Sequence, residues 1–146
     1  MENKILTFKK LNLFTLGFII IASFYGNVLI HEFGHYVIAD ALGLKPRLYL
    51  FDNGQGTGFS FTNQNFYVTY NKNGPDNSLV ALGGPLANLI LCACISLLYF
   101  KIPKRNENVK IILFIIAIVT LLSGILNLLP YGTSDGKILF NMLKNL

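Results

Sequence analysis

Two histidines and a glutamate stand at a spacing that suits metal chemistry. The segment His31-Glu32-Phe33-Gly34-His35 has the pattern H-E-x-x-H. Residues four apart on a helix share one face, so both imidazoles can reach one Zn²⁺ at about 2.0–2.1 Å. Glu32, beside the first ligand, is placed to take a proton from the water that such a metal activates. The pattern predicts a zinc centre, one ion per chain, with Glu32 as its base.

A catalytic zinc usually has three protein ligands and one open position, and the chain holds no third histidine. The third ligand is therefore expected among the acids. Asp135 follows a charge-free run and stands in irregular backbone expected after the last apolar segment, so it is the best candidate. Asp40 lies on the same helix as the histidines but off their shared face. The other acids stand in expected loops or tails, where solvated charge is the commoner role: Glu2, Asp52, Asp76 and Glu107.

Two asparagines stand inside apolar segments near these residues. Asn88 lies in the second such segment, and Asn127 precedes Asp135 by eight positions in the third. An amide in hydrocarbon is unfavourable unless it is hydrogen-bonded, so each of these two either faces the metal site or bonds a neighbouring helix. We assign only the structural role to Asn12 and Asn27 of the first segment.

The composition places these residues in a membrane protein. Of the 146 residues, 53% are hydrophobic and 13% charged, and the mean hydropathy is +0.53. Three runs without acidic, basic or histidine residues cover 11–30, 77–100 and 111–134, and about 20 such residues cross roughly 30 Å of hydrocarbon. This excludes a soluble globular protein, a disordered chain and a disulfide scaffold. We expect one membrane-embedded domain, residues 1–146, of a multi-pass protein in the bacterial cytoplasmic membrane.

The elements that must position the site follow from these runs. We expect membrane-spanning helices over about residues 11–42, 78–100 and 111–129, and a terminal helix over 137–146. Gly43 predicts the end of the first helix, and Gly83-Gly84-Pro85 predicts an interruption near the start of the second. Aromatic and β-branched residues over 47–71 predict a β-hairpin between the first two helices, with strand candidates at 59–62 and 66–70.

The basic residues flank the apolar runs and do not form a nucleic-acid module, although the net charge is +5. Seven lie on one side of a three-span chain and five on the other: Lys4, Lys9, Lys10, Lys101, Lys104, Arg105 and Lys110 against Lys45, Arg47, Lys72, Lys137 and Lys144. This excess favours a cytoplasmic N-terminus, with the zinc site toward the outer face. Cys92 and Cys94 point about 200° apart on a helix, so we expect them neither to pair nor to share a metal.

Three segments together resemble the site-2 protease family of intramembrane zinc metalloproteases. They are 31–35 (H-E-x-x-H), 83–88 (G-G-P-x-x-N) and 127–136 (N-x-x-P…D-G). The resemblance implies a membrane α-helical fold, a three-transmembrane-helix metalloprotease core with a membrane-associated β-hairpin between helices 1 and 2. It implies His31, His35 and Asp135 as zinc ligands, Glu32 as base and acid, and Asn127 and Asn88 as groups that hold the substrate backbone or the oxyanion.

The chain also departs from this family. Members often carry a further proline and a leucine between N-x-x-P and D-G, where this chain has Gly132 and Ser134. The chain shows no regulatory insertion such as a PDZ domain and matches a near-minimal core. The family more often has its site near the cytoplasm, against the distribution of basic residues described above, so the orientation stays open.

The expected function is that of a zinc-dependent intramembrane endopeptidase. Its partners would be a transmembrane or membrane-associated peptide substrate, the lipid bilayer and a possible regulatory partner, with no nucleic acid. A substrate helix must become extended before cleavage, and a strand of the hairpin could hold it by strand addition or serve only as an interface anchor. The alternative is a non-catalytic zinc-binding membrane protein that acts as partner or chaperone of another complex. The intact Glu32 argues against that alternative, because a structural site needs no base.

Overall fold

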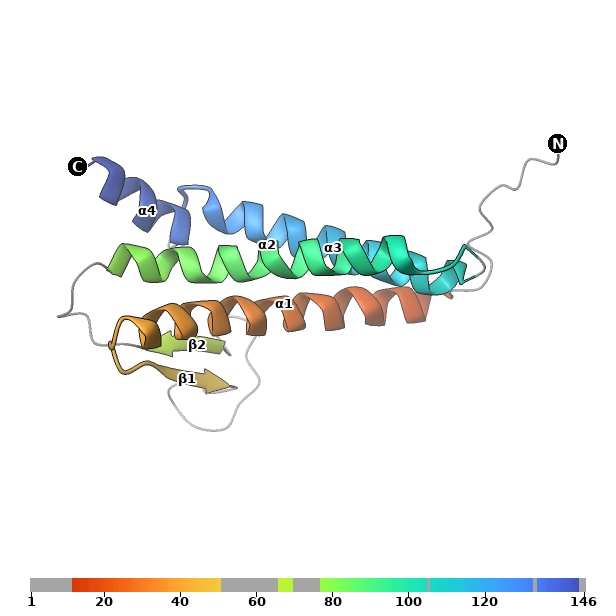
Figure 1. Ribbon diagram of the computed structural model, residues 1–146, viewed down its shortest axis with the longest axis horizontal. Coiled ribbons are helices and arrows are strands. Elements are labelled where there is room, and N and C mark those ends of the chain that lie inside the picture. Colours follow the sequence, from red (N-terminus) through yellow and green to blue (C-terminus); the bar gives the residue numbers. More distant parts are fainter. Residues whose placement is uncertain (1–11, 51–65, 70–76, 105, 133, 145–146) are drawn as a thin grey trace.

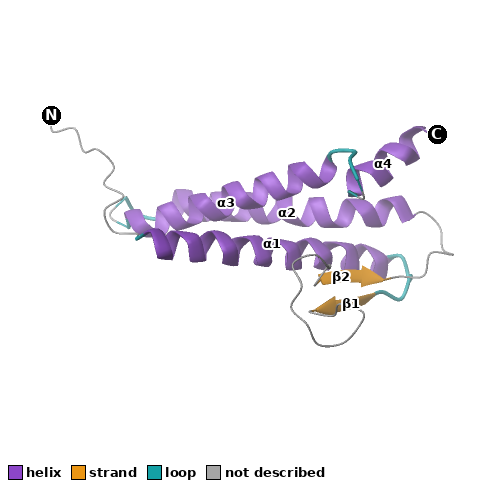
Figure 2. Cartoon of the chain, turned by 180° about the vertical axis from the view of Figure 1, so that it is seen from behind, coloured by secondary structure: helices purple, strands orange, loops and turns teal. Residues whose placement is uncertain are grey.

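The computed structural model describes residues 12–50, 66–69, 77–104, 106–132 and 134–144. These residues form α1 (Leu13–Ala41), β1 (Arg47–Leu50), β2 (Phe66–Thr69), α2 (Asn77–Lys101), α3 (Glu107–Leu128) and α4 (Asp135–Lys144). The three long helices lie lengthwise beside one another, with α2 packed against both α1 and α3 (Figure 1). The strands and α4 gather at the end of the bundle where α1 finishes and α2 begins (Figures 1 and 2).

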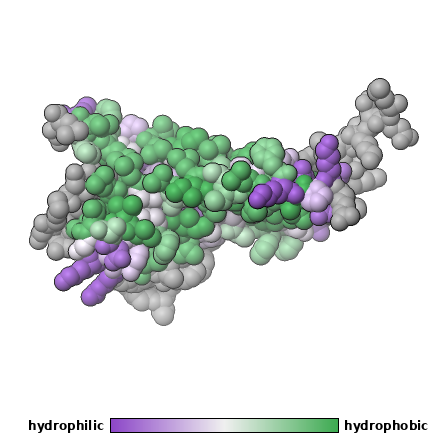
Figure 3. All heavy atoms as spheres, in the orientation of Figure 1, coloured by the Kyte–Doolittle hydropathy of each residue, from purple (hydrophilic) through white to green (hydrophobic). Residues whose placement is uncertain are grey.

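The described residues contain three helices long and apolar enough to cross a membrane, Leu13–Ala41, Leu79–Lys101 and Glu107–Leu128. Their outward side chains are large and hydrophobic: Phe14, Phe18, Leu97 and Phe100 are each more than 60% exposed. Hydrophobic atoms cover most of the visible surface along the bundle, and hydrophilic side chains lie toward its two ends (Figure 3). The expectation of a mostly helical chain with three possible spans is therefore confirmed.

Helix α1 begins and ends at residues suited to those positions. The Asn12 side chain accepts a hydrogen bond from the Thr15 amide at 2.7 Å, which caps the N-terminus. At the other end Gly43 adopts φ +72°, and its N–H donates to the Asp40 carbonyl at 2.9 Å while the Leu44 N–H donates to that of Ala39. A positive φ suits glycine, so the predicted helix end is confirmed. The paired capping bonds fix the point at which the chain leaves toward β1.

The predicted interruption of the second helix is wrong, because α2 runs continuously from Asn77 to Lys101 with Pro85 inside it. Pro85 has no N–H to donate to the preceding turn and so removes one helical hydrogen bond. Gly83 packs directly on the α1 backbone, where an added Cβ would collide with Gly34. We attribute the continuity of the helix to this support from α1. Farther along α2, Cys92 and Cys94 are free, as expected.

The third and fourth helices both start earlier than predicted. α3 begins at Glu107, where an acidic side chain favours the positive end of the helix dipole. It ends at Leu128, because Pro130 restricts Leu129 to extended backbone, with ψ 138°. α4 begins at Asp135, so the expected third ligand opens a helix instead of lying in irregular backbone.

Two short strands lie against the end of α1. β1 and β2 pair antiparallel, with Leu48 opposite Val68, and both contact α1. β2 lies within the predicted strand 66–70, whereas β1 was not singled out as a strand in advance. The candidate strand 59–62 and the connection between β1 and β2 fall outside the described residues, so the hairpin as a whole stays a prediction.

Candidate metal centre

The site is built where α1 and α2 approach most closely. A Cβ on Gly34 would collide with the carbonyl of Gly83, and a Cβ on Gly83 would collide with the carbonyl of Gly34. Two glycines are therefore required for this backbone-to-backbone contact, as small residues are at tight helix crossings in membranes. The same contact lies within the His31–His35 segment of α1 and brings that segment against α2.

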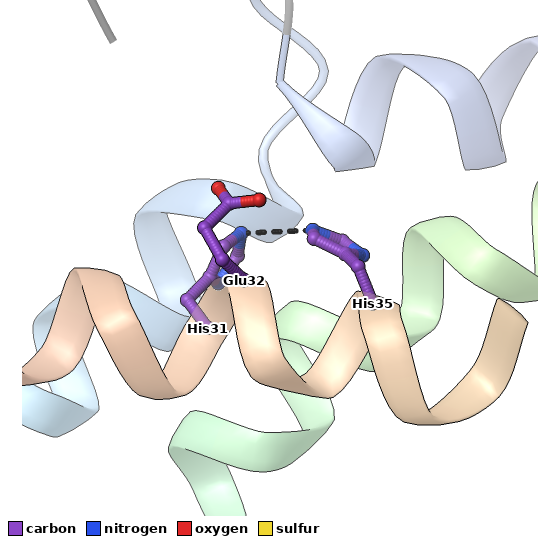
Figure 4. Close-up of side chains that lie close together, drawn as sticks. All are labelled: His31, Glu32 and His35. Atoms are coloured by element: carbon purple, nitrogen blue, oxygen red, sulfur yellow. Dashed lines mark hydrogen bonds between the residues drawn. The ribbon is translucent and has the colours of Figure 1, made fainter. Parts of the chain in front are cut away.

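Both histidines point into this region from successive turns of α1 (Figure 4). Their Nε2 atoms lie 3.2 Å apart, and His31 and His35 are 8% and 9% exposed. The Oδ2 atom of Asp135 lies 2.9 Å from His31 Nε2 and 3.4 Å from His35 Nε2. The structure thus brings together the three residues expected as ligands, from two elements separated by a hundred residues of chain.

A second grouping of possible donors consists of His31, His35 and Glu32, whose ligand atoms lie within 4.8 Å of one another. Glu32 follows directly after His31, and its carboxylate lies beside the His31 imidazole on the same side of α1 (Figure 4). A single oxygen of Asp135, Oδ2, contacts the Nε2 atoms of both imidazoles, at 2.9 and 3.4 Å. We therefore assign Asp135 as the third donor and leave Glu32 free to act beside the site.

The His35 ring is oriented by α2. Its Nδ1 lies 2.7 Å from the carbonyl oxygen of Val80 and 3.3 Å from the backbone nitrogen of Gly84. The shorter contact is to an atom that can only accept, so we assign the proton to Nδ1. In the neutral ring this leaves the Nε2 lone pair for a metal, which is the usual role of such a partner. No sequence pattern marks Val80, because its contribution is a backbone carbonyl.

His31 is oriented by Asn88, whose side-chain amide lies 3.4 Å from His31 Nδ1 and 3.1 Å from Ser123 Oγ. Asn88 is fully buried, and its Oδ1 has no partner among the described residues. The nitrogen and oxygen of an amide are assigned from such contacts. Turned by 180°, Asn88 would accept from His31 Nδ1–H and from the Ser123 hydroxyl, and would leave His31 Nε2 free for a metal.

The expected substrate or oxyanion role of Asn88 does not fit this position. Asn88 is 0% exposed and is absent from the lining of the cavity beside the metal site. It acts behind His31 as a positioning residue, because α2 turns its side chain toward α1 and α3 at this level. Asn127 differs: it lines the cavity, and one of its N–H groups donates to the Ser123 carbonyl at 3.1 Å, which leaves its second N–H available.

Asp135 is held by a tight connection between α3 and α4. The Ser134 hydroxyl donates to the Leu129 carbonyl and accepts from the backbone N–H groups of Tyr131 and Lys137 at 3.2 and 3.3 Å. A Cβ on Gly136 would collide with the carbonyl of Leu128, so the start of α4 rests directly on the end of α3. Ser134, one of the departures from the family pattern, thus closes the turn with its own hydrogen bonds.

The charge of Asp135 suits a ligand. Burial by itself raises its pKa, but the close contacts with His31 and His35 outweigh that effect and hold the pKa below its usual value. The carboxylate is therefore ionised at neutral pH.

Replacing Ser134 by alanine tests this connection. The variant loses three hydrogen bonds that set the direction of Asp135, so we expect the affinity for zinc to fall by roughly 10-fold, at the lower end of the effect of outer-shell partners. Zinc affinity is measured by competition with a chromophoric chelator. Ser96→Ala is the matched control, because Ser96 Oγ bonds only the Cys92 carbonyl within α2. An unchanged affinity in Ser134→Ala would show that the turn does not need this hydroxyl.

A cavity of about 780 Å³ opens beside the three donors. Its polar groups near the metal site come from Glu32, Asn127, Tyr131 and Asp135, and β2 contributes Val68. Val68 and Glu32 line the same cavity, which places the strand beside the glutamate. The cavity is large enough for a peptide segment, and apart from these polar groups, the two histidines and Ser123 its walls are apolar.

The remaining acids do not join the site. Asp40 is exposed near the end of α1, and Glu107 is exposed at the start of α3. Glu2, Asp52 and Asp76 lie outside the described residues. The sequence did not point to Val80 or Ser123, whereas Ser134 carried a usable signal, since serine before Asp-Gly is a favoured helix N-cap.

Comparison of the chain with family models, with curated proteins and with solved structures finds no match. The likeness to the site-2 proteases therefore depends on the three sequence segments and on the arrangement of their residues described above.

Proposed function

We propose that this protein is a zinc-dependent intramembrane endopeptidase of the site-2 protease type. The observation that carries the proposal is the convergence of His31, His35 and Asp135 on one point, with Glu32 beside it and a peptide-sized cavity alongside. The site stands within helices apolar and long enough to cross a membrane. Ionisable groups at such a depth are unfavourable and mark functional sites.

The donor set fits zinc. Ligand atoms at about 2.0–2.1 Å from a tetrahedral zinc ion stand roughly 3.3 Å apart. The three donor atoms are separated by 2.9, 3.2 and 3.4 Å, close to one face of such a tetrahedron. Two neutral imidazoles and one carboxylate are also a common ligand set of hydrolytic zinc sites. When bound, zinc supplies Lewis-acid chemistry, lowering the pKa of water and polarising a carbonyl group.

The residues of the chain provide the remaining chemistry. Glu32 takes the proton of the attacking water as the new C–O bond forms. It then passes this proton to the nitrogen of the leaving amine, and the peptide C–N bond breaks. The free N–H of Asn127 can donate to the oxygen on which negative charge develops. Asn88 and Val80 act indirectly, by holding the two imidazoles in the orientation that zinc binding requires.

We assign substrate holding to β2. A residue in an antiparallel strand directs its N–H and C=O to the same side. Val68 lines the cavity together with Glu32, and we infer that its N–H and C=O point to the edge of β2 that faces away from β1, toward the site. No strand covers that edge within the described part of the chain. An unwound substrate can pair with it and so replace the hydrogen bonds that its own helix has lost.

Removing the metal tests the proposal. The native chain in liposomes should cleave members of a panel of transmembrane peptides, a zinc chelator should abolish cleavage, and added Zn²⁺ but not Mg²⁺ should restore it. Products are identified by mass spectrometry and bound zinc by elemental analysis. Cleavage that resists the chelator, or a purified chain that binds no zinc, would contradict the proposal.

A further inference from the structure

The cavity beside the metal site continues as a groove between α1 and α3. We call it the α1–α3 groove. Its walls are apolar side chains: Ile20, Phe24 and Val28 from α1, and Val119, Leu122 and Leu126 from α3. The α1 positions recur every four residues and lead to Glu32, and the α3 positions are spaced by three and four. Each set therefore forms one stripe on its helix.

The groove leads from the metal site into the apolar middle of the bundle. α2 contributes to the cavity only through Val80 and Ala81 among the described residues, and the Val80 carbonyl lies 2.7 Å from His35 Nδ1. From Glu32 to Ile20 the groove follows α1 for twelve residues, or about 18 Å. Phe24 and Leu122 are 56% and 52% exposed, so the groove opens on the face that meets lipid. An extended chain at about 3.3 Å per residue would place roughly five residues in it.

The opposite end of the cavity is polar. Tyr131 and Asp135 line it there, and Arg47 and Lys137 are exposed on the elements that surround this end. A substrate that passes over Glu32 thus has an apolar path on one side of the cleaved bond and a polar exit on the other. The cavity distinguishes the two sides of that bond by polarity.

The strand β2 supplies the direction of the substrate. Figures 1 and 2 both show β2 running in the same direction as α1. Antiparallel pairing is the slightly more stable arrangement per residue, so a substrate on the free edge of β2 runs opposite to α1. Its N-terminal part then lies at the polar end and its C-terminal part enters the α1–α3 groove.

We propose that the α1–α3 groove binds about five apolar residues that follow the cleaved bond. The substrates are accordingly membrane peptides or proteins cut at the N-terminal end of an apolar segment, with polar residues allowed before the cut. This inference rests on the proposed function, which supplies the cleaved bond, but the binding geometry that it describes can be measured without cleavage.

Crosslinking in a chain that does not cleave provides the test. The Glu32→Gln chain, loaded with zinc, carries Leu122→Cys in the groove. Two peptides of reversed sequence are compared, each with a polar half and an apolar half. In one the polar half comes first, and in the other the apolar half comes first. Each carries one cysteine, at the fourth residue of the apolar half counted from its boundary with the polar half. A short bis-maleimide links the cysteines. The matched control is Leu121→Cys, at a neighbouring leucine that does not line this cavity. The Glu32→Gln chain without an added cysteine measures the background from Cys92 and Cys94.

We expect the polar-first peptide to crosslink to Leu122→Cys at least ten times more efficiently than its reverse, and than to Leu121→Cys. Preference for the apolar-first peptide would overturn the inferred direction. Equal crosslinking of both peptides above background would likewise overturn the direction. Crosslinking of both peptides at the background level would overturn the groove as a substrate site and favour lipid chains as its occupant. Cleavage of the same two peptides by the native chain separately reports on the proposed function, so the two failures are distinct.

Discussion

The Glu32→Gln chain is expected to bind zinc like the native protein and to lose peptide cleavage by about 10²–10⁴-fold, the usual contribution of a general acid–base group. Glutamine matches glutamate in shape, but it cannot carry the proton. The donors His31, His35 and Asp135 are unchanged. Cleavage is measured by mass spectrometry of a transmembrane peptide, and bound zinc by elemental analysis of the same sample.

Asp135→Asn is the informative comparison for this variant. An amide is a much weaker ligand than a carboxylate, and Asp135 contacts both imidazoles, so we expect zinc itself to be lost together with activity. If Glu32→Gln loses zinc and Asp135→Asn retains it, the third donor has been assigned to the wrong acid. If Glu32→Gln keeps full biological function in the cell, the non-catalytic alternative replaces the peptidase.

The part of the site that the sequence predicts depends on local spacing. His31 and His35 share a face because helical residues four apart do so in any fold. Gly43 ends α1 because a glycine readily adopts the positive φ of a helix C-terminus, whatever packs around it. The three long helices follow from runs of apolar residues. Each of these features is decided within about one helical segment, so no knowledge of the packing is needed to anticipate it.

The parts that were missed depend on packing between helices. The sequence left Asn88 either structural or facing the site, and only the rotation of α2 against α1 places its amide behind His31. The break predicted at Gly83-Gly84-Pro85 did not appear, because support from α1 at Gly34 is a tertiary effect. The pairing of β1 with β2 likewise joins two short segments, of which Arg47–Leu50 carries no alternating pattern strong enough to stand out.

A glycine on α2 gives the second of the two largest expected effects. A Cβ on Gly84 would lie 2.5 Å from both Cε1 and Nε2 of His31 and 2.6 Å from His35 Nε2. Two of these three atoms are the metal donors themselves. Gly84→Ala therefore has to displace both imidazoles from these positions, and we expect zinc affinity to fall by about 100-fold or more, beyond the 10–100-fold range typical of outer-shell changes.

Gly17→Ala is the matched control for this variant, because nothing lies within 4 Å of a Cβ added there. Both changes replace a helical glycine by alanine, which favours the helix by about 1 kcal/mol, so a difference between them reports on the contact with the histidines alone. Circular dichroism in detergent should show the same helix content for both, while a competing chelator should strip zinc only from Gly84→Ala. Native zinc affinity in Gly84→Ala would mean that the imidazoles can retreat and still converge. In that case the close approach of α2 would align the helices, and the geometry of the donors would be set by Val80, Asn88 and Ser134.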